Sequence, residues 1–269
     1  FGIGFVCDLY GAARHEIVEL AVTVLCNMAH RGAAGADADT GDGAGILLRI
    51  PDDFIRERMK ADLPGEGAYG LGMVFFSQDE EKTRRASCLI ESLVIASGWK
   101  LLAWRRVPVM PEHLGRVARD AMPQVRQFAV VPDMPGLAPG SDDFERRLFV
   151  LRKSVDQGLA KAGFCQDSVY IVSLSSRTVI YKGMMMAAQV PLFYPDLRDN
   201  RLISPFAIVH QRYSTNTFPS WRLAQPFRTL AHNGEINTIR GNRNWLTARE
   251  QSLESPLFGR DMSRLFPLI

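Results

Sequence analysis

The sequence predicts an α+β protein in which strands supply the functional site. Short apolar runs that suit strands alternate with longer segments whose apolar residues recur every three to four positions, as on one face of a helix. The densest group of polar and charged side chains, residues 210–238, lies around two apolar runs, 206–209 and 229–231. With 269 residues, 46% of them hydrophobic and 23% charged, the chain can bury a large core.

The strands are predicted from short apolar runs bounded by turn residues. They cover residues 1–7, 46–50, 70–76, 100–104, 125–131, 170–174, 178–181 and 206–209. Two glycines in the first run allow close approach by other groups. Only Ser175-Ser176-Arg177 separates the runs 170–174 and 178–181, and this spacing predicts a hairpin.

The helices are predicted from apolar stripes and from the residues at their ends. They cover residues 16–28, 80–97, 111–121, 142–159 and 237–250. Gly32 is placed to end the first helix, and Asp142 to cap the N-terminus of the fourth. In the last helix we expect Trp245 and Leu246 to face inward.

Charge and cysteine spacing argue against several classes of protein. The formal net charge of +3 comes from 32 basic and 29 acidic residues that are interspersed, which gives little support to nucleic-acid binding. Four cysteines are widely spaced without a C-x-x-C pair, so neither a zinc site nor a disulfide framework is indicated. Cys7 and Cys26 are expected to be buried small hydrophobes. No run is long enough to span a membrane, and no signal peptide is indicated, so we expect a cytoplasmic protein without a metal.

Residues 210–238 carry the chemistry expected of a site. Arg212 offers a planar fork of donors that can grip a carboxylate through two hydrogen bonds. Asn233-Gly234 can present a side-chain amide beside a backbone N–H, and two such donors make an oxyanion hole worth about 2–4 kcal/mol per donor. The alternatives are a surface ion pair for Arg212 and a turn for Asn233-Gly234.

Residues 37–45 form an Asp- and Gly-rich loop, Asp-Ala-Asp-Thr-Gly-Asp-Gly-Ala-Gly. It lacks the closing glutamate of an EF-hand and the lysine of a phosphate-binding loop. A glycine-rich loop beside a site and a plain turn both remain open. His30, before it, could act as a base, although a helix cap or core histidine fits the pattern better.

Several motifs occur in a familiar order. They are Phe1-Gly-Ile-Gly-Phe, His30-Arg-Gly-Ala, Thr40-Gly-Asp-Gly-Ala-Gly, Ser173-Leu-Ser-Ser-Arg-Thr, Tyr181-Lys-Gly, His210-Gln-Arg-Tyr-Ser-Thr-Asn-Thr-Phe-Pro-Ser-Trp and Leu230-Ala-His-Asn-Gly-Glu-Ile-Asn-Thr. With them the chain resembles the N-terminal class II glutamine amidotransferase domain of the glutamate synthase large subunit, over essentially all 269 residues. The resemblance implies an N-terminal-nucleophile hydrolase fold, a four-layer αββα sandwich of two antiparallel sheets.

The resemblance also implies a reaction and a set of site residues. L-glutamine would be hydrolysed, and its ammonia passed to synthase domains of the same polypeptide for glutamate synthesis from 2-oxoglutarate. Arg212 would hold the glutamine α-carboxylate, while Asn233 and Gly234 would form the oxyanion hole. Arg31 would support the nucleophile region and, with His232, belong to the substrate-binding set. The loop around Asp42 would lie beside the site. FMN and an iron–sulfur cluster are expected in later domains, and no cofactor in this segment.

Two departures from the family pattern bear on activity. The family nucleophile is a cysteine at the first position, where this chain has Phe1. Its own α-amine, with a reference pKa of about 8, can take the thiol proton, whereas phenylalanine offers no lone pair for attack. Cys7 is no substitute, because six residues of extended strand span roughly 20 Å.

The second departure lies at the other end of the chain. The family's downstream Ser-Asp-Ser segment, whose aspartate binds the substrate amine, is absent. We therefore expect a fragment with an exposed apolar edge.

Three interpretations follow from the sequence. The first is the glutaminase segment of a glutamate synthase, inactive as written because of Phe1. The second is a degenerate domain with a structural or regulatory role. The third is another class II amidotransferase that supplies nitrogen to a nucleotide or sugar. The long form of the motif at residues 215–221 argues against the third.

Overall fold

The fold consists of two four-stranded antiparallel sheets. The computed structural model describes residues 2–34, 37–133, 136–212, 218–227 and 239–268. One sheet has the order β1 (Gly2–Cys7), β8 (Phe206–Gln211), β2 (Ala44–Arg49) and β7 (Thr178–Gly183). The other has the order β4 (Trp99–Arg106), β5 (Gln124–Pro132), β3 (Gly70–Phe76) and β6 (Val169–Ser175). The predicted α+β class with two antiparallel sheets is confirmed.

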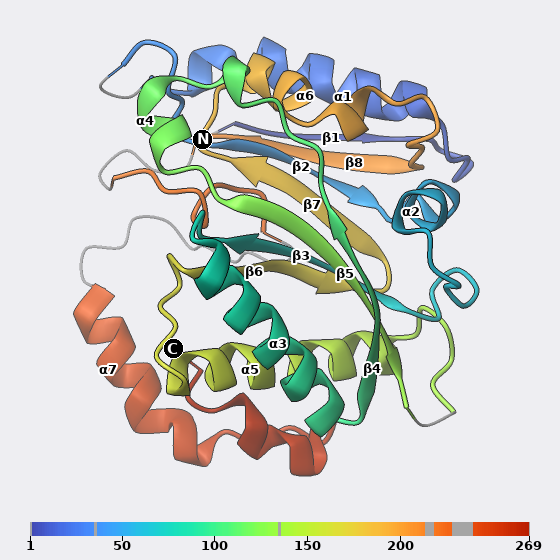
Figure 1. Ribbon diagram of the computed structural model, residues 1–269, viewed down its shortest axis with the longest axis vertical. Helices are drawn as coiled ribbons and strands as arrows, with labels where there is room; N and C mark the ends of the chain where they lie inside the picture. Colours follow the sequence, from blue (N-terminus) through green and yellow to red (C-terminus); the bar gives the residue numbers. More distant parts are fainter. Residues whose placement is uncertain (1, 35–36, 134–135, 213–217, 228–238, 269) are drawn as a thin grey trace.

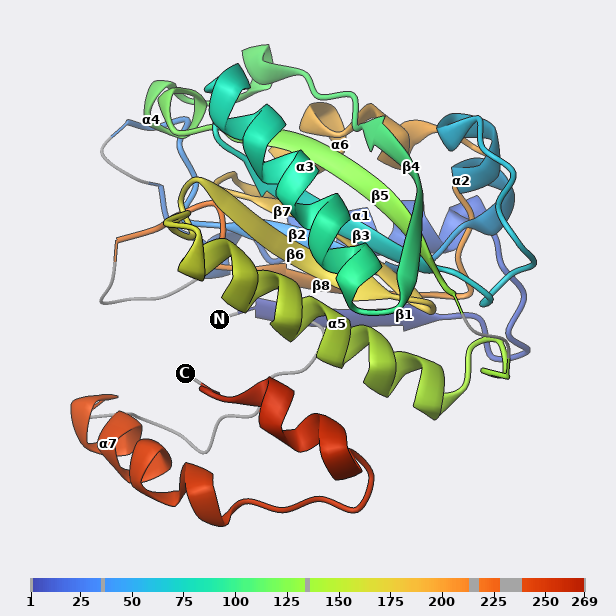
Figure 2. The same cartoon turned by 60° about the horizontal axis from the view of Figure 1, so that its bottom comes forward.

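Helices cover the outer face of each sheet, so that the molecule has four layers (Figures 1 and 2). Helix α1 (His15–Asn27) and the short α6 (Val190–Phe193) lie on the first sheet, and α3 (Glu80–Ala96) and α5 (Asp142–Lys161) on the second. The remaining helices are α2 (Asp52–Met59), α4 (Arg116–Asp120) and α7 (Ile239–Arg249). Short 3-10 turns span Ala29–Arg31, Pro111–His113, Ala187–Gln189, Pro195–Arg198, Glu250–Ser252 and Gly259–Leu265.

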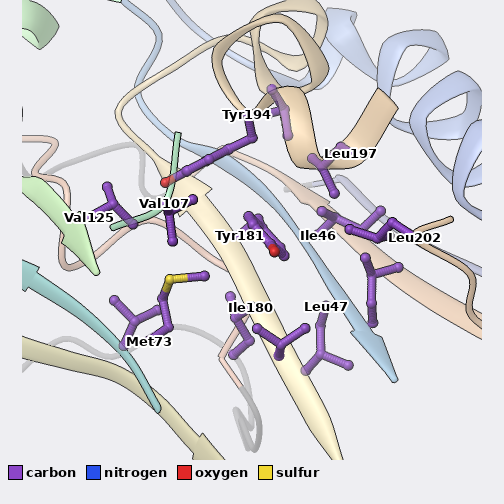
Figure 3. Packing of buried hydrophobic residues seen from close by; sticks show 14 of the residues in the cluster. Ile46, Leu47, Met73, Val107, Val125, Ile180, Tyr181, Tyr194, Leu197 and Leu202 are labelled. Atoms are coloured by element: carbon purple, nitrogen blue, oxygen red, sulfur yellow. The ribbon is translucent and has the colours of Figure 1, made fainter. Parts of the chain in front are cut away.

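The protein has two hydrophobic cores, because apolar side chains on successive residues of a strand point to opposite faces of the sheet. Met73 of β3 and Val125 of β5 belong to one buried cluster with Ile180 of β7 and Leu47 of β2, so this core contains residues of both sheets (Figure 3). The intervening Val74 belongs to a second core, beneath α3 and α5. Because successive side chains of a strand point to opposite faces, β3 contributes to both cores and is buried along its whole length.

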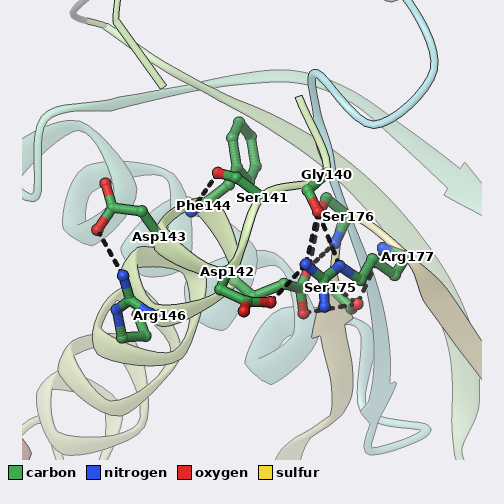
Figure 4. A network of polar contacts seen from close by, with 10 residues as sticks. Gly140, Ser141, Asp142, Asp143, Phe144, Arg146, Ser175, Ser176 and Arg177 are labelled. Carbon is green, nitrogen blue, oxygen red and sulfur yellow. Dashed lines mark hydrogen bonds and ion pairs between the residues drawn. The ribbon is translucent and has the colours of Figure 1, made fainter. Parts of the chain in front are cut away.

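The predicted hairpin of residues 170–181 is wrong. β6 pairs with β3 and β7 pairs with β2, so the chain passes from one sheet to the other between Ser175 and Thr178. The buried carboxylate of Glu145 accepts hydrogen bonds from the Ser176 N–H at 2.6 Å and from the Ser175 hydroxyl. Figure 4 shows this crossover, with Arg177 donating to the Gly140 carbonyl and to Asp142 beside it. Hydrogen bonds made by side chains, and not the backbone hydrogen bonds of a hairpin, thus stabilise this crossover.

Other details of the predicted elements also need correction. Ser141, not Asp142, caps α5, because its hydroxyl accepts the Phe144 N–H at 3.2 Å. The segment 111–121 is not one helix, since Gly115 separates the turn Pro111–His113 from α4. Trp245 is 70% exposed rather than inward.

The cysteines and the apolar residues of strand β1 are accessible to solvent. Cys7 is exposed and Cys26 half-buried, so neither is the buried hydrophobe predicted from sequence, and all four cysteines are free thiols. On β1, Ile3 and Phe5 are 70% and 63% exposed. In the part of the chain described here, β1 pairs with β8 alone.

Candidate functional site

Four strand ends of the first sheet meet at one place. Gly2 pairs with Gln211, Gln211 with Ala44, and Ala44 with Gly183, so these residues form one row across β1, β8, β2 and β7. Arg212 directly follows this row. Because β1 pairs with β8, the start of the chain lies beside a motif some 210 positions later in the sequence.

Arg212 is held in an unusual backbone conformation at this edge. Its φ of 78° lies in the left-handed region, which is uncommon for a residue with a side chain. Its N–H donates to the Gly43 carbonyl at 2.8 Å, and its Nε lies 3.4 Å from Oδ2 of Asp42. A local strain of about 1–3 kcal/mol is thus offset by contacts with the loop before β2.

The Asp- and Gly-rich loop lies beside the site, as expected. Asp42 is 7% exposed, and its Oδ1 accepts the Ala33 N–H at 3.3 Å. Burial raises the pKa of the Asp42 carboxyl, while the Ala33 N–H and Arg212 act in the opposite direction. The loop thus places the Asp42 carboxyl group next to the Arg212 guanidinium.

The turn after α1 brings Arg31 to the same edge. A Cβ on Gly2 would lie 3.2 Å from the Cβ of Arg31, so the two backbones are close. Gly32 does not end α1, as the sequence suggested. The helix ends at Asn27, and Gly32 has extended backbone angles (φ −84°, ψ 177°). A glycine is needed at position 32 for a different reason. A Cβ there would lie 2.2 Å from Nε2 of Gln211 and would clash with it.

Polar side chains that the sequence analysis did not single out lie close to this row. Gln211 is 2% exposed, and its Oε1 has no hydrogen-bond partner among the described residues. His210 is buried, and burial lowers its pKa to about 4. The signal that could have found these two residues is their place next to Arg212, at the polar end of an apolar run.

Lys182 is a buried lysine on β7 that the sequence analysis quoted only as part of a motif. Its Nζ donates to the Arg222 carbonyl at 3.0 Å and lies 3.9 Å from the centre of the Phe227 ring. Burial lowers the pKa of Lys182 well below its usual range. The lysine thereby fastens the segment after the Arg212 motif to the sheet.

The remaining predicted site residues cannot be placed. Phe1, His232, Asn233 and Gly234 lie outside the described residues, as does the apolar run 229–231. Of the predicted set, the structure brings together Arg212, Arg31 and the loop around Asp42. These three form a polar edge next to the first described residue, Gly2.

Comparison with known families decides what this edge belongs to. A family model described as "Glutamine amidotransferases class-II" matches residues 1–269, the whole chain. The chain belongs to the class-II glutamine amidotransferases. Its curated relatives include glutamate synthase large chains, which agrees with the resemblance found in the sequence motifs.

Curated relatives of this amidotransferase domain are much longer proteins. It is 44% identical over 272 residues to "Glutamate synthase [NADPH] large chain" of Bacillus subtilis, covering 100% of this chain and 17% of the relative. It is 42% identical to "Glutamate synthase [NADH]" of Schizosaccharomyces pombe, covering 100% of this chain and 13% of the relative. It is also 42% identical to "Ferredoxin-dependent glutamate synthase, chloroplastic" of rice, covering 97% and 16%.

Two further features are absent from the part of the amidotransferase domain that the structure describes. Among the residues that the structure describes, no helix is both long and apolar enough to cross a membrane. Within the same residues, no group of three or more His, Cys, Asp or Glu side chains is arranged to hold a metal ion.

Proposed function

We propose that this domain is the glutaminase segment of a glutamate synthase, with L-glutamine as its substrate. Ammonia from the glutamine amide would pass to synthase domains of the same polypeptide, for glutamate synthesis from 2-oxoglutarate. The observation that carries the proposal is the match of the family over residues 1–269, with Arg212 at the meeting point of the strand ends.

The proposed roles of the site residues follow from charge and geometry. Arg212 binds the substrate α-carboxylate through its guanidinium, for which the planar fork is suited. Arg31 and His232 complete the substrate-binding set around the nucleophile position. Asn233 and Gly234 donate hydrogen bonds to the oxyanion that forms when the amide carbon is attacked.

Phe1 interrupts this reaction at its first step. In the family a cysteine sulfur attacks the amide carbon, forms a tetrahedral intermediate, and releases ammonia to leave a thioester that water then hydrolyses. A benzyl side chain has no lone pair to form that bond and no thiol proton to transfer. We therefore propose that the chain as written binds glutamine but does not hydrolyse it.

The substrate assignment is tested by binding to the full-length protein. L-glutamine is titrated against the wild type and against Arg212→Lys, which keeps the charge but loses the bidentate geometry. We expect saturable binding by the wild type and a loss of at least about tenfold in Arg212→Lys. Absence of glutamine binding by a folded wild type would contradict the proposal.

A second candidate is a non-catalytic amidotransferase domain with a structural or regulatory role. Phe1 itself favours this candidate, because it removes the one group that the chemistry requires. The two candidates differ in what Phe1→Cys would do: a site that is otherwise intact would regain hydrolysis, whereas a degenerate site would not.

Three expectations stay predictions. FMN and an iron–sulfur cluster belong to later domains in this proposal, and the relatives' names include NADPH, NADH and ferredoxin as electron donors. A cytoplasmic location is still expected. The substrate amine would be bound by an aspartate downstream of residue 269.

A further inference from the structure

The backbone of Arg212 fixes where its side chain starts, but not the orientation of its guanidinium. The left-handed φ of 78° and the N–H bond to Gly43 direct the side chain away from β8 toward the loop before β2. There Nε lies 3.4 Å from Oδ2 of Asp42 as an ion pair, and neither of these two buried atoms has a hydrogen-bond partner among the described residues. Asp42 therefore contacts the guanidinium at Nε and not at its two Nη groups, which are the pair of donors suited to a carboxylate ligand.

Asp42 is itself held from two sides. Its N–H donates to the Ala33 carbonyl at 3.0 Å, and its Oδ1 accepts the Ala33 N–H at 3.3 Å. One carboxylate oxygen is thus bound to the backbone and the other faces Arg212. The Asp42 side chain is 10% exposed, against 28% for Arg212, so the carboxylate is the inner member of the pair.

The loop that carries Asp42 is anchored on α4. Oδ2 of Asp37 accepts the Val117 N–H at 3.0 Å and the Thr40 hydroxyl at 2.9 Å, and Oγ1 of Thr40 accepts the Ala118 N–H at 3.3 Å. A Cβ on Gly41 would lie 2.2 Å from the backbone of Met185. The loop backbone at Gly41 therefore packs directly against the backbone at Met185, and only a glycine fits at this point of the loop.

We propose that Asp42 is a positioning residue for glutamine binding: its carboxylate holds the Arg212 guanidinium in the orientation that receives the substrate α-carboxylate. This inference rests on the proposed function, because it needs Arg212 to bind that group. A carboxylate that only stabilised the fold would affect all ligands of the site equally. One that acts through Arg212 affects only ligands that carry an α-carboxylate.

The experiment uses two ligands and a matched control variant. The full-length protein carries Phe1→Ala, whose first residue has no nucleophilic group, so that glutamine binding is measured without turnover. L-glutamine and 4-aminobutanamide, which is glutamine without its α-carboxylate, are titrated by ligand-observed NMR. Asp42→Asn is compared with Asp39→Asn, an exposed aspartate on the same loop, and thermal melting checks that each variant folds.

We expect Asp42→Asn to weaken L-glutamine binding about tenfold and to leave 4-aminobutanamide binding unchanged, with no effect of Asp39→Asn on either ligand. Equal affinities of Asp42→Asn and the parent for L-glutamine would overturn the inference and leave the proposed function intact. An equal loss for both ligands would also overturn it, since Asp42 would then support the site in general. Absence of glutamine binding by the folded parent would overturn the proposed function, and this inference with it.

Discussion

Arg105 Nη2 and Asp196 Oδ1 lie 2.6 Å apart in the protein interior. The Tyr181 hydroxyl donates to the other oxygen of Asp196 at 3.0 Å, and Arg105 Nη1 donates to Oε1 of Gln127 at 2.7 Å. These four buried side chains connect β4, β5 and β7 to the 3-10 turn Pro195–Arg198. A buried ion pair with its remaining atoms hydrogen-bonded avoids the cost of an isolated buried charge.

Breaking this pair should destabilise the protein strongly. Asp196→Ala leaves Arg105 buried without its counterion, so we expect the free energy of unfolding to fall by about 3–5 kcal/mol in urea denaturation. The control is Glu81→Gln, which breaks an exposed pair with Arg84 and should cost less than about 0.5 kcal/mol. Similar losses in the two variants would show that the buried network adds nothing to stability.

The crossover between the sheets depends on one carboxylate. Glu145→Ala removes the acceptor of the Ser176 N–H and of the Ser175 and Ser176 hydroxyls. We expect a loss of about 2–3 kcal/mol of unfolding free energy, because buried donors are then left without partners. Asp143→Asn, at a half-exposed position of the same helix where the carboxylate pairs with Arg146 and Arg147, is the matched control. An equal melting temperature for the two variants would contradict this role.

Packing of α1 against β1 leaves no room at Gly4. A Cβ there would lie 2.4 Å from Cγ1 of Val24, so Gly4→Ala should cost about 1–3 kcal/mol of unfolding free energy. Gly65→Ala is the control, since nothing lies within 4 Å of the added atom. Wild-type stability of Gly4→Ala in urea unfolding would mean that the helix can move away from the sheet at little cost.

Buried His210 should make stability depend on pH. The unfolded side chain takes up a proton below about pH 6.5, whereas the folded one does so only near its lowered pKa of about 4. Unfolding therefore binds a proton between these values, and stability falls as pH drops from 6.5 to 4. The loss is at most about 3 kcal/mol, and less after solvent screening.

Chemical denaturation across that pH range isolates the effect. As the pH falls, the free energy of unfolding should decrease more for the wild type than for His210→Asn. A difference between wild type and His210→Asn that stays constant from pH 7 to pH 4 would refute the lowered pKa.

Much of the fold could be predicted because its causes are local. The apolar run at β3, for example, is bounded by turn residues, and the polar residues at the end of β8 stand out against the apolar ones before them. The pairing of β6 could not be predicted in this way. A three-residue link fits a hairpin as well as a crossover, and the deciding residue, Glu145, lies 30 positions before Ser175.

The site was predicted from motif chemistry, and its internal contacts were not. The carboxylate-binding role of Arg212 stays a prediction, whereas the predicted place of the Asp42 loop beside Arg212 is what the structure shows. Their ion pair joins residues 170 positions apart, and it depends on strand register and on the left-handed backbone at Arg212, neither of which a sequence pattern specifies. Lys182 was overlooked as a functional candidate because a lysine at a strand end is usually exposed.

The central claim is that Phe1 alone silences an otherwise sound glutaminase site. The most direct measurement is ammonia release from L-glutamine by the full-length protein with Phe1 and with Phe1→Cys, after intact mass has shown that residue 1 is the free N-terminus. We expect release by the cysteine form, strongly reduced by a further Arg212→Met, and none by the phenylalanine form. Release by the phenylalanine form, or no release by a folded cysteine form, would contradict the claim.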